Sequence, residues 1–293
     1  DPLSKEPDFK YTCVAIEKYK KPTEKIVVVG AGAAAFRFIQ NYREINTQDE
    51  IVVFSNEKNP FYNRVLLPEY VTAELSWEQL LKIKEEALAK LNITLQSEVA
   101  INHINTDEKK ITDSNGAIHH YDTLILATGS RPFVPENAQL HLPGRFTIRK
   151  KDDADRLRNY LEQTQLPPEE QHVVIVGGGL LGLELAAALK HKKVKITIIQ
   201  RASRLMERQL DRISSKLLAE EVQQRDIQIY FDNEVSTVFS TNRAHELEIA
   251  LKSGRTLTAN AIVYTIGTIP NIEVAKEAGL TCARGVKVNQ YLQ

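Results

Sequence analysis

The sequence is poor in cysteine and has no surplus of either charge. Its two cysteines, Cys13 and Cys282, exclude a disulfide framework and a four-cysteine metal site. The 38 Lys and Arg residues balance 38 Asp and Glu residues, so the basic excess typical of nucleic-acid-binding proteins is missing. No run approaches the ~18 consecutive apolar residues of a membrane-spanning helix. We therefore expect neither nucleic acid nor membrane as a partner, no bound metal, and a reducing, cytoplasmic location.

What the sequence does contain is a pattern that occurs twice along 293 residues, a length suited to two domains. Residues 26–29 form an apolar run that ends at Gly30 and precedes helix-forming residues 33–45. Residues 173–176 form a similar run, which ends at Gly177 before a helical stretch. An apolar run bounded by glycine and followed by a helix indicates a buried parallel strand. The repetition indicates an internal duplication.

The rest of each copy continues in the same order. Further strands are predicted at residues 51–54, 124–127, 195–199, 227–231 and 261–266. Further helices are predicted at 77–90, 152–163, 180–190 and 211–224. Antiparallel ribbons are predicted at 101–119 and 235–257. This order predicts an α/β fold with two doubly wound, three-layer, Rossmann-like dinucleotide-binding domains.

The two glycine-rich turns carry the chemistry. The first is a G-x-G-x-x-A motif and the second a full G-x-G-x-x-G motif, with Gly30, Gly32 and Ala35, and Gly177, Gly179 and Gly182, at the fixed positions. The first glycine makes the tight turn, the second lets the backbone approach a pyrophosphate, and the third position lets the helix pack closely on the strand. Two such turns predict two dinucleotides, and a flavin with a nicotinamide is the natural pairing.

The end of the second strand of each copy normally carries an acidic residue that binds ribose hydroxyls. In the first copy Ser55 occupies this position, and Glu57 is the candidate, with a surface carboxylate as the alternative. In the second copy Gln200 is followed by Arg201 and Arg204, which favours or tolerates a 2′-phosphate, because arginine grips phosphate as a bidentate fork. The alternative there is a solvated basic turn.

Five stretches of the chain give the sequence a family resemblance. With the duplicated turns, residues 127–132 (ATGSRP) and 266–271 (IGTIPN) resemble FAD-dependent pyridine-nucleotide oxidoreductases with two dinucleotide domains. Residues 60–67 (PFYNRVLL), 177–184 (GGGLLGLE) and 205–211 (LMERQLD) are similar to the flavoprotein part of assimilatory NAD(P)H nitrite reductase large subunits and to NAD(P)H:rubredoxin reductases. The resemblance covers residues 25–293.

The resemblance, together with the strand-end residues Glu57, Gln200 and Arg201, gives a set of cofactor-binding residues, and it implies a division into domains. For FAD the set is Gly30, Gly32, Ala35, Glu57, Asn63, Arg64, Thr128 and Gly129; for NAD(P)H it is Gly177, Gly179, Gly182, Glu184 near the nicotinamide end, Gln200, Arg201 and Gly267. Residues 25–143 and 270–293 would form the FAD-type domain, with the NAD(P)H-binding domain, 144–269, inserted in it. The flavin carries the hydride chemistry, so no catalytic side chain is expected.

Two departures from the family pattern bear on function. Many relatives have a lysine near the flavin ring where this chain has Pro68 and Glu69. The chain also lacks the Cys-x-x-Cys of a disulfide reductase, so electrons would pass from the flavin to a metal centre in the parent chain or to a carrier protein. The family's second FAD motif would follow Gln293, so we expect this stretch alone to hold FAD weakly.

The N-terminal stretch, residues 1–24, reads as a linker or as the tail of a preceding domain. It is similar to the last residues of molybdopterin-dependent nitrate or formate reductases, with a Pro- and Lys-rich linker as the alternative. We therefore expect part of a longer assimilatory nitrate or nitrite reductase, in which an oligomer is possible. The alternatives are a free-standing rubredoxin or ferredoxin reductase and a non-catalytic nucleotide-binding docking module.

Overall fold

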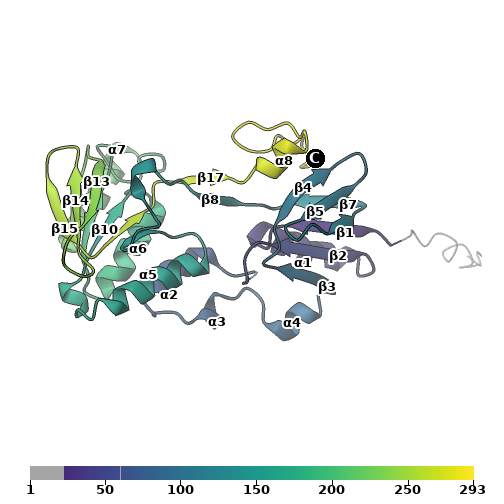
Figure 1. Ribbon diagram of the computed structural model, residues 1–293, viewed down its shortest axis with the longest axis horizontal. Coiled ribbons are helices and arrows are strands. Elements are labelled where there is room, and N and C mark those ends of the chain that lie inside the picture. The colour runs from purple at the N-terminus through teal and green to yellow at the C-terminus, as the bar shows by residue number, and fades with distance from the viewer. Residues whose placement is uncertain (1–22, 60) are drawn as a thin grey trace, which may run out of the picture.

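The computed structural model describes residues 23–59 and 61–293. The predicted linker or tail therefore lies almost entirely outside the described residues, as does Cys13. The described chain forms two lobes, joined by an extended two-stranded ribbon of β8 (Ser130–Pro132) and β17 (Thr268–Pro270) (Figure 1).

The first lobe is built on a four-stranded parallel sheet in the order β3-β2-β1-β7. Its strands and the helix after β1 are β1 (Lys25–Val29), α1 (Ala33–Ile45), β2 (Glu50–Ser55), β3 (Ile93–Ser97) and β7 (Thr123–Leu126). Val27 and Val28 point to opposite faces and are both fully buried, because α1 covers one face and a three-stranded antiparallel ribbon covers the other. The ribbon strands are β4 (Ile101–Asn105), β5 (Lys110–Asp113) and β6 (Ile118–His120).

The second lobe repeats this architecture with a fifth strand. Its parallel sheet has the order β12-β11-β10-β16-β9, formed by β9 (Arg145–Thr147), β10 (His172–Val176), β11 (Lys195–Ile199), β12 (Ile227–Tyr230) and β16 (Ala261–Tyr264). The helices are α5 (Lys151–Gln163), α6 (Leu180–His191) and α7 (Arg212–Gln224), and the covering ribbon is β13 (Val235–Ser240), β14 (Leu247–Leu251) and β15 (Thr256–Ala259). Both lobes are therefore three-layered and doubly wound, as predicted.

One predicted helix is wrong. Residues 77–90 form two short helices, α3 (Trp77–Leu80) and α4 (Glu85–Ala89), instead of one. The residues between them pair with the chain near β2: Asn63 N–H donates to the Leu80 carbonyl, and Lys82 N–H donates to the Phe61 carbonyl. Long-range backbone hydrogen bonds have replaced the i to i+4 bonds that would continue the helix. The strand β3, whose residues alternate between half-buried and exposed, was not predicted.

The short helix α2 (Leu67–Val71) ties the lobes together. It follows the 3₁₀ turn η2 (Arg64–Leu66), belongs by sequence to the first lobe, and packs against α5 and α6 of the second (Figure 1). Its apolar residues Leu67, Tyr70 and Val71 lie in the same buried cluster as Leu185 and Ala186 of α6. The seam between the lobes at α2 is therefore continuous hydrophobic core. The chain continues after β17 into α8 (Glu273–Glu277), which packs near the first lobe's ribbon.

Candidate functional site

The first glycine of each motif makes a turn that only glycine can make. Gly30 has φ +107°, and a Cβ there would lie 2.2 Å from the Ala127 carbonyl oxygen. Gly177 has φ +112°, and its Cβ would lie 2.7 Å from the Thr265 carbonyl oxygen. Each glycine N–H also donates to a backbone carbonyl near the end of the neighbouring strand. Gly30 donates to the Phe54 carbonyl and Gly177 to the Ile199 carbonyl, both at 2.8 Å. The chain is thus held at the carboxyl end of each sheet.

The second glycine of each motif faces open space. A Cβ on Gly32 or Gly179 would meet nothing within 4 Å, so neither glycine is required by the packing of the protein itself. Each is the N-cap of a helix of at least 12 residues and has no side-chain cap, which leaves the first backbone N–H groups free for an anion. These two positions are where a dinucleotide pyrophosphate fits without a side chain in its way.

The third motif position is occupied differently in the two lobes. Ala35 is fully buried in the first, whereas a Cβ on Gly182 would lie 2.1 Å from the Gly177 carbonyl oxygen. The α6 helix therefore lies closer to its own turn than α1 does. This difference agrees with the alanine and the glycine in the two motifs.

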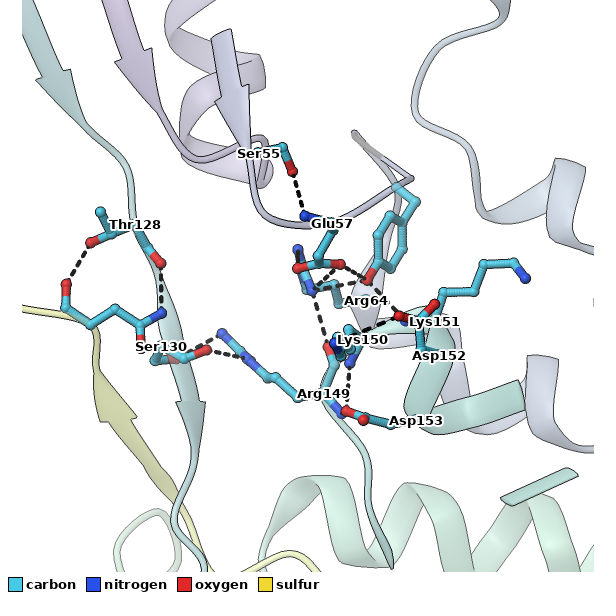
Figure 2. A network of polar contacts seen from close by, with 12 residues as sticks. Ser55, Glu57, Arg64, Thr128, Ser130, Arg149, Lys150, Lys151, Asp152 and Asp153 are labelled. Atoms are coloured by element: carbon cyan, nitrogen blue, oxygen red, sulfur yellow. Dashed lines mark hydrogen bonds and ion pairs between the residues drawn. The ribbon is translucent and has the colours of Figure 1, made fainter. Parts of the chain in front are cut away.

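Glu57 is fixed by two neighbours beyond the end of β2. The Arg64 guanidinium forms an ion pair with it, 2.8 Å between Nη2 and Oε1, and the Tyr62 hydroxyl donates to Oε2 at 2.8 Å (Figure 2). Arg64 Nη1 also donates to the Tyr62 hydroxyl and to the Arg149 carbonyl oxygen. Burial raises the pKa of Tyr62, so the hydroxyl remains a neutral donor. Asn63, in turn, accepts from Val65 N–H and begins η2.

Arg149 is a site residue that the sequence analysis missed. Its Nε and Nη2 donate to the carbonyl and hydroxyl oxygens of Ser130 at 3.1 and 2.8 Å, which links the segment after β9 to β8 (Figure 2). Burial and then the charge of Arg64 lower its pKa, and within the described chain no carboxylate forms an ion pair with it. A half-buried guanidinium that forms no ion pair is suited to an anionic ligand. The sequence signal that could have indicated Arg149 is its position just after a parallel strand of the second sheet, where ligand-binding residues usually lie.

Thr128 and Gly129 lie beside Arg149's partner Ser130. The Thr128 hydroxyl donates to the Asn271 carbonyl at 2.6 Å, and the Asn271 amide returns a bond to the Thr128 carbonyl at 2.8 Å. Gly129, with φ +65°, is exposed, and a Cβ there would meet nothing within 4 Å. The two strands of the connecting ribbon are thereby locked at the edge of the first lobe's sheet.

Gln200 is turned inward. Its Oε1 accepts from Gly178 N–H at 2.7 Å and its Nε2 donates to the Arg204 carbonyl, and the residue is only 8% exposed. It therefore holds the second glycine turn in shape and presents no charge at the strand end. Arg201 is exposed and makes no hydrogen bond or ion pair within the described residues. Gly267, with φ +112°, begins the return into β17.

A basic pocket lies beside this strand end. It has a volume of about 620 Å³ between the loop after β11 and α7. Three cations, Arg204, Arg212 and Lys216, and one carboxylate, Glu207, line it. The net positive charge makes it a candidate anion site.

The described residues hold no group of three or more His, Cys, Asp or Glu side chains arranged to bind a metal ion. No helix among them has both the length and the apolar character needed to cross a bilayer.

These features define a class: two glycine-rich turns, each at the N-terminus of a helix on a doubly wound sheet, are typical of enzymes that bind two dinucleotides. The family can be named directly. Residues 24–293 match the pyridine nucleotide-disulphide oxidoreductase family, and the chain belongs to it. The predicted fold class, the oxidoreductase class and the FAD and NAD(P)H cofactors are thereby confirmed.

Individual relatives agree with the resemblance found in the sequence. The chain is 30% identical over 271 residues to the assimilatory nitrate reductase electron transfer subunit of Bacillus subtilis (strain 168), covering 92% of this chain and 34% of that one. It is 29% identical to the nitrite reductase [NAD(P)H] of the same organism, covering 92% and 33%. The chain thus spans about a third of the length of these curated relatives.

Among solved structures, the reductase chain of the covalent putidaredoxin reductase–putidaredoxin complex superposes with a TM-score of 0.86. It is 25% identical, with 92% of this chain and 64% of that one covered. The names of these relatives describe an electron transfer subunit of nitrate reductase, an NAD(P)H-dependent nitrite reductase and a putidaredoxin reductase.

Proposed function

We propose that this chain is the reductase module of an assimilatory nitrate or nitrite reductase, taking electrons from NAD(P)H through FAD to a metal centre in the parent protein or to a carrier. The observation that carries the proposal is the pair of open glycine positions, Gly32 and Gly179, each at a helix N-terminus. The bound flavin would supply the hydride and electron chemistry. The relatives' names support the nitrogen-oxide context.

In this proposal the domain division is that of the sequence analysis. Residues 25–143 and 270–293 hold FAD and residues 144–269 hold NAD(P)H. The first turn binds the FAD pyrophosphate, and Arg64 and Arg149, together with Thr128 and Gly129, supply donors and positive charge along the flavin. Glu57, fixed by Arg64, accepts from ribose through its remaining lone pairs. In the other domain, Gly177 and Gly182 shape the turn that binds the coenzyme.

The exit of electrons follows from the cysteine count. A family member with two cysteines at positions 13 and 282 has no Cys-x-x-Cys dithiol beside its flavin. The acceptor is therefore an external centre, which favours a nitrate or nitrite reductase module or a rubredoxin or ferredoxin reductase over a disulfide reductase. A reducing, cytoplasmic location is consistent with the free Cys282.

The test is anaerobic flavin spectroscopy on the protein supplied with FAD. We expect NAD(P)H to bleach the oxidised flavin and a one-electron acceptor to restore it. Arg149→Met should lower flavin affinity by about tenfold or more, because a charge-assisted hydrogen bond contributes about 1.5–3 kcal/mol. If the flavin of the folded protein stayed oxidised with either coenzyme, the reductase proposal would be wrong and the non-catalytic docking module would be favoured.

Coenzyme choice gives a separate prediction. We expect NADPH to be accepted at least as well as NADH. Inward-facing Gln200 presents no carboxylate against a 2′-phosphate, the exposed Arg201 follows it in the chain, and Arg204 lines the basic pocket beside it. Arg201→Ala should weaken NADPH binding by up to about tenfold and leave NADH unchanged, the effect shrinking as salt screens the exposed side chain. Arg225→Ala, at the far end of α7, is the matched control. A clear preference for NADH, with Arg201→Ala weakening both alike, would refute this.

A further inference from the structure

Tyr62 lies beside Glu57 and Arg64, which form an ion pair just beyond the end of β2 (Figure 2). Tyr62 is 2% exposed, and its ring packs against Trp77, the only tryptophan of the sequence, with 5.1 Å between the ring centroids. The Arg64 guanidinium carbon lies 4.7 Å from the centre of the same ring. Packing therefore fixes the ring, and the hydroxyl group meets its neighbours from one direction.

The neighbours of the Tyr62 hydroxyl determine where its proton points. The oxygen accepts two hydrogen bonds, from Arg64 Nη1 at 2.9 Å and from the Lys151 backbone N–H at 3.1 Å. Neither of these groups can accept a hydrogen bond in return. The single hydroxyl proton is therefore donated to Glu57 Oε2, which lies 2.8 Å away.

One of the two donors to this hydroxyl belongs to the second lobe. Lys151 is the first residue of α5, and the N–H groups in the first turn of a helix have no partner within the helix. Tyr62 satisfies one of them. The second lobe thus fixes the hydroxyl that holds a carboxylate of the first lobe.

The hydroxyl also competes with the Glu57 carboxylate for Arg64. Arg64 Nη2 lies 2.8 Å from Glu57 Oε1, whereas Nη1 is 3.3 Å from Oε2 and closer, at 2.9 Å, to the Tyr62 oxygen. Without the hydroxyl, the guanidinium and the carboxylate would favour the bidentate fork of two parallel hydrogen bonds. The carboxylate would turn to form it. In the present geometry Oε1 accepts from one donor of the described residues and keeps a lone pair for a ligand hydroxyl.

We propose that Tyr62 is a positioning residue of the first-lobe site, whose hydroxyl aims Oε1 of Glu57 at a ribose hydroxyl of the bound dinucleotide. This role rests on the proposed function, in which Glu57 accepts from ribose. The location of Glu57 supports it, because an acidic residue near the carboxyl end of the second strand is suited to ribose. The first glycine turn is joined to the same strand end by the bond from Gly30 N–H to the Phe54 carbonyl.

The test compares FAD with an analogue whose adenosine ribose lacks the 2′-hydroxyl group. Titrations followed by flavin fluorescence give both dissociation constants. We expect the wild type to bind FAD about tenfold more tightly than the analogue, as for a hydrogen bond to a charged acceptor. In Tyr62→Phe, which keeps the ring, FAD should bind more weakly and this ratio should fall to about threefold or less. A purely structural role would weaken both ligands alike and leave the ratio unchanged.

Two further variants sharpen the comparison. Tyr42→Phe removes another hydroxyl that is hydrogen-bonded to a carboxylate, that of Asp49 before the start of β2, and should leave the ratio unchanged. Tyr62→Phe combined with Arg64→Lys should recover part of the discrimination, because an ammonium group cannot form the bidentate fork. Trp77 emission should be the same in the wild type and in Tyr62→Phe, which shows that the ring packing is kept.

The outcomes separate this role from the proposed function. If Tyr62→Phe bound FAD and kept the wild-type ratio, the positioning role would be wrong while the proposed function stood. The same holds if the wild type bound FAD and the analogue equally well. If the folded wild type bound no FAD at all, the proposed function would fail, and the role of Tyr62 with it.

Discussion

Gly179→Val is expected to abolish binding of NAD(P)H while leaving the protein folded. A Cβ at this position meets nothing within 4 Å, and Gly179 has φ −88° and ψ −175°, an extended conformation that valine adopts readily. The side chain would therefore occupy only the space in which the backbone meets a pyrophosphate. Calorimetry should show at least about a hundredfold loss of affinity, comparable to losing two charge-assisted hydrogen bonds.

The duplicated fold provides a reciprocal control. Gly32→Val places the same side chain in the corresponding open space of the first lobe, also at a helix N-cap. It should weaken FAD binding and leave NAD(P)H binding intact, the reverse of Gly179→Val. Urea unfolding should show little change in stability for either variant. Unchanged coenzyme affinity in a folded Gly179→Val protein would exclude the assigned pyrophosphate site.

Gly30→Ala is expected to produce the largest loss of stability, about 3 kcal/mol or more, from a single added methyl group. The backbone φ of +107° is strained for any L-residue, and the new Cβ would lie 2.2 Å from a backbone oxygen that cannot rotate away. Relief requires β1 and β7 to separate at their carboxyl ends. Urea denaturation of the variant and the wild type measures the difference.

Gly32→Ala, two residues along, is the matched control for stability. Its extended backbone and open surroundings accommodate a methyl group, so its unfolding free energy should stay within about 1 kcal/mol of the wild type. If the two alanine variants proved equally stable, the tight approach of Gly30 to Ala127 would be wrong.

The strand–turn–helix units could be predicted from sequence because each depends on local features. Four consecutive apolar residues, a glycine that must adopt positive φ and a run of helix formers lie within about twenty residues, and no distant contact is needed to recognise them. The prediction of one helix over residues 77–90 failed for the opposite reason. Its middle is held by Phe61 and Asn63, whose proximity depends on the tertiary fold.

The same distinction separates the site residues that could be found from those that could not. Gly179 belongs to a motif, so its role can be read locally. Arg149 belongs to no motif, and its role depends on residues that are distant in sequence. Its guanidinium donates to Ser130, 19 residues away, and its carbonyl accepts from Arg64, 85 residues away. Gln200 was correctly placed at the strand end, but sequence alone could not show that its amide turns back onto Gly178.

The packing of α2 into the second lobe has a consequence for how the protein can be taken apart. Leu67, Tyr70 and Val71 come from one lobe's sequence yet are buried with the core of the other. If residues 144–269 were expressed alone, α2 would be missing and the apolar surface of α5 and α6 against which it packs would be exposed to water. Because the covering helix is shared, the boundary of the coenzyme-binding module as a folding unit differs from its boundary along the chain. Melting of the first lobe would therefore also remove part of the second lobe's core.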